Sequence, residues 1–233
     1  MSVDISLVIP AYNEETRIVK SLQKAIDYLD ASGKSYEIIL VDDGSKDTTV
    51  LLASSFEPKV KVIRQPKNIG KGAAVRTGML ASVGDICFFS DADLSTPIYE
   101  MTKLTKIIDA GADICIGSRA VDRSMVKEHQ PFYRESMGKV FNYLVQFIVM
   151  KGIKDTQCGF KAFSRKAVNA VFPVAKIDGF SFDVEILYLA RKAGLRIDQC
   201  SVEWYNDMRS TVNPIKDSIK MIIELFRIRR LHK

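Results

Sequence analysis

The stretch Gly84-Asp-Ile-Cys-Phe-Phe-Ser-Asp-Ala-Asp-Leu-Ser-Thr-Pro97 joins a short apolar run to two acidic residues. Residues 86–89 predict a buried strand, and Asp91 and Asp93 follow directly after it. Side chains two positions apart in an extended segment point to the same side, so the two carboxylates can converge on one cation. Thr96-Pro97 is typical of the start of a helix. The stretch therefore predicts a strand, an acidic turn and a helix in close succession.

Two aspartates separated by one residue suit Mg²⁺ or Mn²⁺, because these ions prefer oxygen ligands and complete their coordination with water or phosphate oxygens. Asp91 and Asp93 thus indicate a divalent metal and a phosphate-bearing substrate. The alternative is a polar turn that caps a helix and binds nothing. The residues that the rest of the chain brings to the same place decide between the two.

Length and composition indicate a single α/β domain with a substantial core, since the chain has 233 residues, 47% of them apolar. The N-terminus enters a predicted strand at once, without the pattern of a signal peptide. No stretch approaches the roughly 18 uninterrupted apolar residues that indicate a membrane span. The four cysteines are widely spaced, so we expect free, mostly buried thiols in a reducing cytoplasm rather than zinc ligands or disulfides.

The excess positive charge is concentrated near the C-terminus. The formal net charge is +6, and residues 216–233 contain six Lys or Arg but only two acidic residues. Residues 215, 219, 222, 223 and 226 are apolar and share one face of a predicted helix. A basic amphipathic helix suits the plane of an anionic membrane interface, although a helix docked on the protein with one solvated face fits the pattern equally well.

Predicted strands and helices alternate along the first half of the chain. Strands are expected at residues 5–9, 36–41, 60–64, 86–89 and 113–117, and Asn13 is expected to cap the first helix. This order predicts a mainly parallel sheet covered by helices on both faces, with ligands bound at the carboxyl ends of the strands. The residues predicted at that edge are Tyr12, Asn13, Glu14, Asp42, Asp43, Asp91, Asp93, Ser118 and Arg119. Their clustering favours a functional site over a set of unrelated turns.

Asn68-Ile-Gly-Lys-Gly72 opens a further helix, and its glycines would let backbone N–H groups approach an anion beside Lys71. The second half is less regular. It contains a basic loop at 119–133, an apolar helix at 137–150, a strand entered through a polar turn at 155–163, and a helix from Gly179 with an acidic first turn. The apolar helix is predicted either to pack into the core or to face lipid.

Six segments together resemble the family 2 glycosyltransferases, and within them the dolichyl- or polyprenyl-phosphate sugar transferases of the β-glucosyl type. The segments are Val8-Ile-Pro-Ala-Tyr-Asn-Glu14, Val41-Asp-Asp-Gly-Ser45, Asn68-Ile-Gly-Lys-Gly72, Asp91-Ala-Asp93, Gly117-Ser-Arg119 and Asp155-Thr-Gln-Cys-Gly-Phe-Lys161. The resemblance extends from Val8 to Trp204. The early segments are shared by the whole family, whereas the last one and Asp91-Ala-Asp-Leu-Ser95 point to the lipid-phosphate branch.

The resemblance implies a GT-A fold, that is, an α/β fold with a Rossmann-like, mostly parallel sheet flanked by helices. It implies one domain over residues 1–233, with a nucleotide-sugar-binding half at 1–119, an acceptor half at 120–213 and a basic amphipathic helix at 214–233. The expected reaction is inverting, metal-dependent transfer of a hexose from a nucleotide sugar, UDP-glucose, to a polyprenyl or dolichyl phosphate. The expected location is peripheral, on the cytoplasmic face of a membrane, with no nucleic acid as partner.

Carried over residue by residue, the resemblance assigns three sets of side chains. The nucleotide would be held by Pro10, Tyr12, Glu14, Asp43 and Lys71. Asp91 and Asp93 would bind the metal, and the catalytic set would also include Gln157, Asp183 and Glu185. The acceptor phosphate would face Arg119, Arg134, Ser136 and Arg209. The family often has Ser-Lys after the Trp, where this chain has Arg209-Ser-Thr211, so either Arg209 supplies that charge or the contact is missing.

Three alternatives remain open. A family 2 transferase could act on a saccharide or protein hydroxyl, which needs a general base such as Asp183 or Glu185, whereas a dianionic lipid phosphate needs only positioning. Residues 88–95 also resemble the aspartate motif of haloacid-dehalogenase-type phosphatases, which normally follows a first strand rather than a fourth. The third alternative is a non-catalytic nucleotide-sugar-binding or membrane-adaptor protein.

Overall fold

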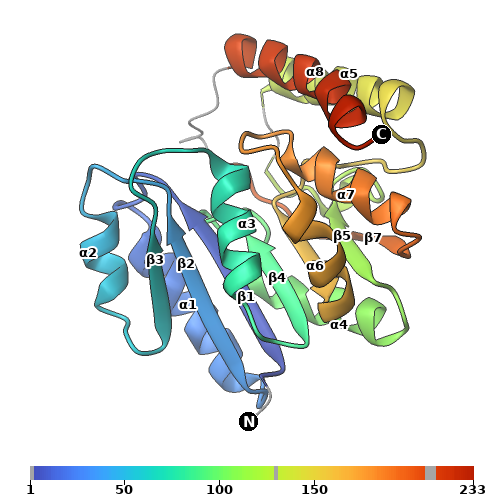
Figure 1. Cartoon of the computed structure of the whole chain (residues 1–233). Coiled ribbons are helices and arrows are strands. Elements are labelled where there is room, and N and C mark those ends of the chain that lie inside the picture. Colours follow the sequence, from blue (N-terminus) through green and yellow to red (C-terminus); the bar gives the residue numbers. More distant parts are fainter. Residues whose placement is uncertain (1–2, 129–130, 208–213) are drawn as a thin grey trace.

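A computed structural model describes residues 3–128, 131–207 and 214–233, and its seven strands form one sheet (Figure 1). Along the sheet the order is β3-β2-β1-β4-β6-β5-β7, and only β6 runs antiparallel to its neighbours. The strands are β1 Ile5–Ala11, β2 Tyr36–Asp42, β3 Val60–Arg64, β4 Ile86–Ser90, β5 Ile114–Ser118, β6 Phe160–Ser164 and β7 Ile197–Ser201. The prediction of a mostly parallel sheet flanked by helices is confirmed.

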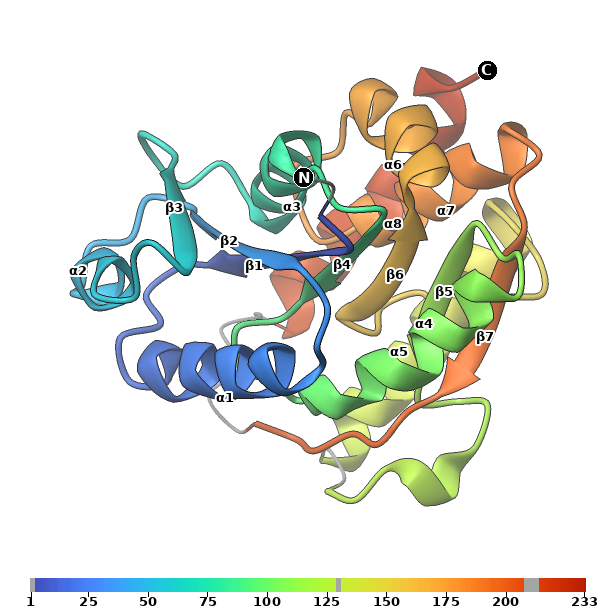
Figure 2. The same cartoon turned by 90° about the horizontal axis from the view of Figure 1, so that it is seen from below.

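Helices cover both faces of the sheet. Helices α1 and α4 lie on one face, and α3, α6 and α7 lie on the other (Figure 2). Helices α5 and α8 lie side by side at one end of the molecule (Figure 1). The helices are α1 Ile18–Ala31, α2 Thr49–Ser54, α3 Lys71–Ala81, α4 Met101–Asp109, α5 Phe132–Ile148, α6 Arg165–Val171, α7 Phe182–Lys192 and α8 Pro214–Leu231.

The central strands explain why the core is two-sided. All seven residues of β1 and all five of β4 are buried, as expected for strands that helices cover on both faces. Phe88 of β4 packs towards one face with Phe160, and Phe89 packs towards the other with Phe163. The apolar run that predicted β4 is therefore divided between two hydrophobic clusters, one on each side of the sheet.

The helix starts differ from the prediction. Helix α1 begins at Ile18, and Asn13 does not cap it but adopts a positive φ of 55° and accepts the Lys46 N–H through its side chain. Pro97 precedes a short 3₁₀ turn at Ile98–Glu100, and α4 begins only at Met101. In both places the chain first forms a polar turn at the carboxyl edge of the sheet, so the helix begins later than its sequence signals indicate.

The segment at 155–163 agrees with the prediction of a strand entered through a polar turn, because its first half lies outside any strand and Phe160–Ser164 forms the strand β6. This strand lies between β4 and β5, and the carbonyl of Gly159 accepts the Asp91 N–H at 3.0 Å. Helix α6, which the sequence analysis did not predict, follows at once and is capped by Ser164, whose side chain accepts the Ala167 N–H. The antiparallel strand thus places the 155–159 turn beside the acidic end of β4.

Helix α5 packs into the core on one side and is exposed on the other. Phe141 and Val145 are buried in the core, whereas Tyr143 and Phe147 on its other side are 70% and 80% exposed. Within the described residues, no helix is both long enough and apolar enough to span a membrane.

Helix α8 is oriented differently from the expectation of a docked apolar face. Ile219, Ile223 and Phe226, which belong to the predicted apolar face, are exposed, while Leu225 and Ile228 are fully buried against the protein. Ile215 lies in a part of the helix whose side chains are not described. The apolar stripe that the sequence suggests therefore points largely away from the protein.

We predict opposite effects on stability for two helical Gly→Ala substitutions. A Cβ at Gly78 of α3 would overlap the side chains of Val8 and Val41, so Gly78→Ala should lower the free energy of unfolding by about 1–3 kcal/mol. Nothing lies within 4 Å of a Cβ at Gly138 of α5, so Gly138→Ala should be neutral or stabilising by about 0.5–1 kcal/mol. Urea denaturation measures both. Equal destabilisation by the two substitutions would contradict this account of how α3 packs on the sheet.

Candidate active site

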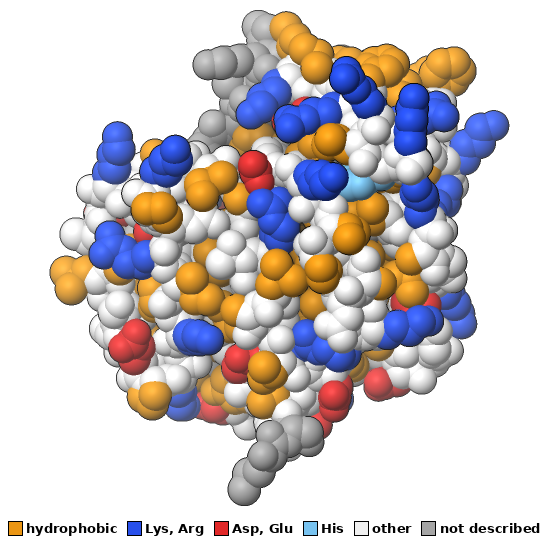
Figure 3. Space-filling view, in the orientation of Figure 1, with side chains coloured by type: hydrophobic (Ala, Val, Ile, Leu, Met, Phe, Trp, Pro, Cys, Tyr) orange, Lys and Arg blue, Asp and Glu red, His pale blue; other side chains and the backbone are white. Residues whose placement is uncertain are grey.

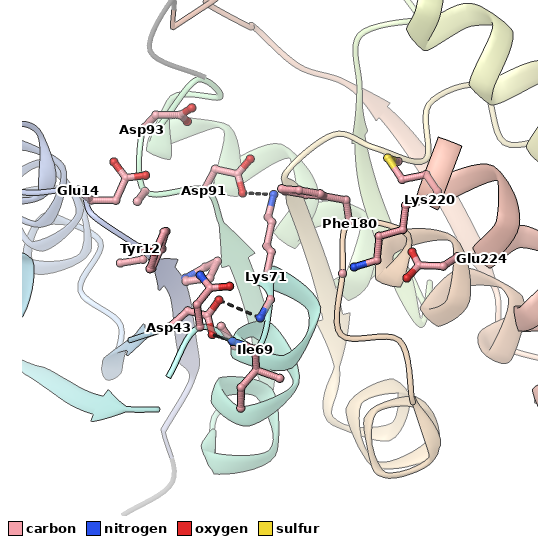
Figure 4. A pocket seen from close by; sticks show the side chains of 18 of the residues that line it. Tyr12, Glu14, Asp43, Ile69, Lys71, Asp91, Asp93, Phe180, Lys220 and Glu224 are labelled. Carbon is pink, nitrogen blue, oxygen red and sulfur yellow. Dashed lines mark hydrogen bonds and ion pairs between the residues drawn. The ribbon is translucent and has the colours of Figure 1, made fainter. Parts of the chain in front are cut away.

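A cavity of about 340 Å³ lies at the carboxyl ends of β1, β2 and β4. Figure 4 shows Tyr12, Glu14 and Asp43 on one side of it, Lys71 and the acidic pair at its centre, and Phe180, Lys220 and Glu224 on the other side. Of the residues predicted from sequence, Pro10, Tyr12, Glu14, Asp43, Lys71, Asp91 and Asp93 all line it. The structure thus brings together the predicted nucleotide-binding and metal-binding sets.

The acidic pair is held at the end of β4 by its own turn. The Asp91 Oδ1 atom lies 2.5 Å from the Lys71 Nζ atom, and the Asp93 Oδ1 atom accepts the Ser95 N–H at 2.8 Å. A Cβ at position 159 would overlap the Asp91 carboxylate, so a larger residue there would displace this carboxylate. Burial raises the pKa of Asp93, and repulsion by the charge of Asp91 raises it further.

Lys71 reaches the acidic pair from the first turn of α3. Burial opposes the charged form of this lysine, but attraction by Asp91 and by Asp183 outweighs burial and raises its pKa. Its Nζ atom also lies 6.0 Å from the centre of the Phe182 ring. Lys71 is therefore an ammonium ion held at the centre of the cavity.

Asp183 lies beneath this lysine and is paired with a second one. Lys161 of β6 is fully buried, donates to Asp183 and to the Cys158 carbonyl at 2.6 Å, and lies 4.9 Å from the Phe89 ring centre. Burial raises the pKa of Asp183, while Lys161 and Lys71 act in the opposite direction. Asp183 is thus a buried counter-ion of Lys161 that also attracts Lys71.

Asp43 fixes the loop that leads into α3. Its two carboxylate oxygens accept the N–H groups of Ile69 and Gly70 at 2.8 and 2.9 Å. Gly70 has a φ of 131°, and a Cβ there would overlap the Asp178 carbonyl. Each carboxylate oxygen can accept a second hydrogen bond, so Asp43 can position the loop and still contact a ligand.

Glu14 is paired with Arg17, a cavity-lining residue that the sequence analysis missed. Arg17 donates to both oxygens of Glu14, from Nη2 at 2.7 Å and from Nε, and to Asp207 at 2.9 Å. The charge of Arg17 also acts to lower the pKa of Asp93. Lys71 and Arg17 therefore place one positive charge near each member of the acidic pair.

A second cavity, of about 380 Å³, is lined by two of the four predicted acceptor residues, Arg119 and Arg134. Arg119 forms a two-pronged ion pair with Asp155, at 2.7 Å from Nε and 2.9 Å from Nη2, and its guanidinium lies 5.3 Å from the Trp204 ring centre. Burial of Asp155 would raise its pKa, but Arg119 outweighs this effect and lowers it. Arg134 and Gln157 line the same cavity.

This second cavity holds polar atoms with unused hydrogen-bonding capacity. Thr156 Oγ1, Gln157 Nε2 and Asn142 Oδ1 are buried and have no partner among the described residues. Further basic side chains, Arg123, Lys139 and Lys154, also line it. An anion that carries several oxygen atoms would satisfy both the donors and the positive charge.

Three predicted residues that the structure describes, Asp183, Glu185 and Ser136, line neither cavity. Glu185 lies two residues after Asp183, about 200° further around α7. Its buried carboxylate accepts the N–H groups of Lys176 and Ile177 and contacts His232 at 2.6 Å. Ser136 is half-buried in α5 and lines neither cavity. Arg209 lies outside the described residues.

The residues at the end of β4 fit a divalent ion that brings its own further ligands. Within the described ranges no three Asp, Glu, His or Cys side chains are grouped to hold a metal. Mg²⁺ and Mn²⁺ need only one or two carboxylates when water and phosphate oxygens complete the coordination. Burial, and then the negative charge of Asp91, raise the pKa of Asp93, and a bound dication would offset both effects.

Comparisons with known proteins agree on one family. The model of the family described as glycosyl transferase family 2 matches residues 6–172. The dolichyl-phosphate beta-glucosyltransferase of Dictyostelium discoideum is 38% identical over 246 residues, which cover 98% of this chain and 74% of that protein. The Homo sapiens protein of the same name is 35% identical, covering 97% of this chain and 74% of its own length.

Solved structures share the fold at lower identity. Glucosyl-3-phosphoglycerate synthase from Mycobacterium tuberculosis, in complex with UDP, has a TM-score of 0.72 and 21% identity, covering 97% of this chain and 80% of that one. Its complex with Mn²⁺, UDP-glucose and phosphoglyceric acid has a TM-score of 0.71 and 20% identity, covering 97% and 78%. The GT-A fold of this chain is thereby established.

We predict that removing the charge of Asp183 is costly for stability. Asp183→Asn leaves Lys161 buried without its counter-ion and should lower the free energy of unfolding by about 3–5 kcal/mol. Asp178→Asn is the matched control, because its pair with Arg76 is partly exposed and should contribute less than about 1 kcal/mol. Urea denaturation at neutral pH measures both values. A loss for Asp183→Asn no larger than that of the control would contradict the buried-pair assignment.

Proposed function

The chain belongs to glycosyltransferase family 2, and on that premise we propose that it transfers glucose from UDP-glucose to a dolichyl or polyprenyl phosphate, with inversion at the anomeric carbon. The observation that carries the proposal is the pair of adjoining cavities. One contains the acidic pair with Lys71, and the other contains Arg119, Arg134 and Gln157. Residues 1–119 supply most of the first cavity and residues 120–213 most of the second, which supports the proposed division into donor and acceptor halves.

The donor cavity can hold a nucleoside diphosphate through complementary contacts. Tyr12 and Pro10 offer apolar surface to the base, and Asp43 offers a hydrogen-bond acceptor. A divalent ion on Asp91 and Asp93 would supply stabilisation of the negative charge that collects on the departing diphosphate. Lys71 adds a fixed positive charge at the same place and holds Asp91 in position.

The acceptor side supports a phosphate rather than a hydroxyl. A phosphate monoester is largely dianionic at pH 7 and attacks without losing a proton. Arg134 and the part of Arg119 not engaged by Asp155 can orient it, with Gln157 between the acceptor and the donor sugar. A hydroxyl acceptor would need a general base, and the two candidates are committed elsewhere: Asp183 to Lys161, and Glu185 to backbone N–H groups and His232.

The proximity of the two cavities supports direct transfer. The Asp91 carboxylate lies against Gly159, two residues after Gln157, and the charge of Asp91 contributes to the raised pKa of Arg119. A donor on the acidic pair and an acceptor on Arg119 would therefore meet across the 155–159 turn. Family membership excludes the phosphatase alternative, and turnover separates a transferase from a protein that only binds nucleotide sugars.

We predict metal-dependent glucosyl transfer from UDP-glucose to dolichyl phosphate. Chelation with EDTA should abolish the product, and Mg²⁺ or Mn²⁺ should restore it. Asp93→Asn should lower kcat/KM by at least ~100-fold because the charge that develops on the diphosphate loses its counter-ion site. Asp109→Asn, at an exposed carboxylate in α4, is the control and should leave activity unchanged. The measurement is transfer of radiolabelled glucose into the lipid phase.

Three results would contradict this reaction. Product formation that survives complete chelation would remove the role of the acidic pair. Transfer to free saccharides in place of lipid phosphate would favour the alternative family 2 reaction, and metal-dependent UDP-glucose binding without any product would indicate a non-catalytic protein.

The proposal includes peripheral attachment to the cytoplasmic face of a membrane through α5 and α8. Tyr143 and Phe147 on α5 and Ile219, Ile223 and Phe226 on α8 are between 57% and 80% exposed. Figure 3 shows hydrophobic side chains along the upper edge of the molecule, over α8, with Lys and Arg side chains next to them. Tyr143 also lines the acceptor cavity, so a lipid chain could lie along α5 while its phosphate reaches Arg134.

We predict that this surface binds anionic bilayers. Ile223→Ser combined with Phe226→Ser should weaken sedimentation with phosphatidylserine-containing vesicles at least ~10-fold, because both apolar contacts with the acyl region are lost. Leu51→Ser is the control, since this residue of α2 is 72% exposed but far from α8. Transfer to a short, water-soluble prenyl phosphate should be unchanged in both variants. Unaltered vesicle binding by the double variant would show that α8 does not carry the attachment.

A further inference from the structure

Helix α8 contributes to the donor cavity as well as to the molecular surface. Lys220, Met221 and Glu224 line the cavity that also contains the acidic pair. In Figure 4, Lys220 and Glu224 lie beyond Phe180, on the side of Lys71 opposite Tyr12 and Asp43. This end of the cavity has no assigned role once a nucleoside is placed on Tyr12 and Asp43 and a diphosphate on the acidic pair.

Glu224 is a buried carboxylate with unused capacity. The side chain is only 6% exposed, and its Oε2 atom has no hydrogen-bond partner among the described residues. A buried, unpartnered carboxylate oxygen is costly, so such an atom beside a cavity indicates that a ligand supplies the missing donor. Gly179 borders the same end of the cavity, since a Cβ at that position would lie 3.4 Å from Glu224 Oε1 and 3.7 Å from Lys220 Nζ.

The chemistry of the carboxylate restricts the ligand group. An ionised carboxylate only accepts hydrogen bonds, so its partner must present O–H or N–H groups. The diphosphate is negatively charged and would be repelled, and its place lies at the acidic pair. The hydroxyl groups of the transferred sugar are neutral donors and are attached on the far side of the diphosphate from the nucleoside, which is the direction in which Glu224 lies.

We propose that Glu224 is a sugar-binding, specificity-determining residue that accepts hydrogen bonds from hydroxyl groups of the donor hexose. The inference rests on the proposed function, because it takes the donor to be a nucleotide sugar. Hydrogen bonds to a buried charged acceptor discriminate strongly against analogues that lack the hydroxyl, because the acceptor is then left unsatisfied. Among nucleotide sugars with the same nucleotide, Glu224 would thus favour a sugar with one particular arrangement of hydroxyl groups.

The test is calorimetric binding of UDP, UDP-glucose and monodeoxy UDP-glucose analogues, in the presence of Mn²⁺, to the parent protein, Glu224→Gln and Glu224→Ala. The parent should bind UDP-glucose more tightly than UDP. Glu224→Ala should lose about 10- to 100-fold of UDP-glucose affinity while its UDP affinity stays within about 2-fold. For one of the deoxy analogues, the affinity of the parent should be as low as the affinity of Glu224→Ala for UDP-glucose. Glu224→Ala itself should bind this analogue and UDP-glucose equally well.

The controls separate binding from folding. Glu224→Gln keeps the size of the side chain and should retain the melting temperature of the ligand-free protein, and Asp109→Asn, at an exposed carboxylate, should bind all ligands as the parent does. If Glu224→Gln and Glu224→Ala keep the full preference for UDP-glucose over UDP, the inference is overturned while the proposed function stands. Equal affinity of the parent for UDP and UDP-glucose, with transfer activity intact, would overturn it as well. A parent protein that neither binds UDP-glucose nor forms product would overturn the proposed function itself.

Discussion

A chain of alternating charges beneath the donor cavity holds the site together. Lys161 from β6, Asp183 from α7, Lys71 from α3 and Asp91 from β4 follow one another, each next to an opposite charge. Lys161 and Asp183 would not be tolerated alone at their depth, because an unpaired buried charge costs several kcal/mol, whereas Lys71 and Asp91 are partly exposed. Four elements far apart in the sequence must therefore assemble together, and the carboxylate of Asp91 is fixed relative to the ammonium of Lys71 before any ligand arrives.

The same charge chain explains why the two cavities differ in the charged groups that they offer. It engages Asp183 with Lys161, so one of the two carboxylates predicted as a base is instead a counter-ion. The acceptor cavity is correspondingly rich in cations and in unpartnered polar atoms, and Asp155 limits the orientation of Arg119 rather than removing its charge. Such a site suits an acceptor that is already an anion, because orientation and charge neutralisation are then all that the protein needs to provide.

Sequence patterns were sufficient where the fold follows from local periodicity. Parallel strands end at the same edge, so acids that follow β2 and β4 had to meet there, and Lys71 follows from its position at a helix start. Sequence patterns failed to predict a contact where it depends on a partner that is distant in sequence. Asp183 and Glu185 look equivalent in the sequence, yet two residues of helix turn them to opposite sides. In the sequence, Arg17 and Glu224 resemble ordinary surface residues of helices. Only the folded chain shows that Arg17 pairs with Asp207 and that α8 brings Glu224 to the cavity.

Helix α8 shows the limit of amphipathic pattern as a guide to packing. Its apolar stripe was recognisable, but the stripe points outward, while the inward face combines Leu225 and Ile228 with the carboxylate of Glu224. An apolar face exposed to water has a free-energy cost, and this cost is removed when another apolar phase covers the face. A bilayer that covers α8 would also hold Glu224 at the edge of the donor cavity. Attachment to the membrane and completion of the sugar site would then depend on the same helix, and the donor would be bound best where the lipid acceptor is present.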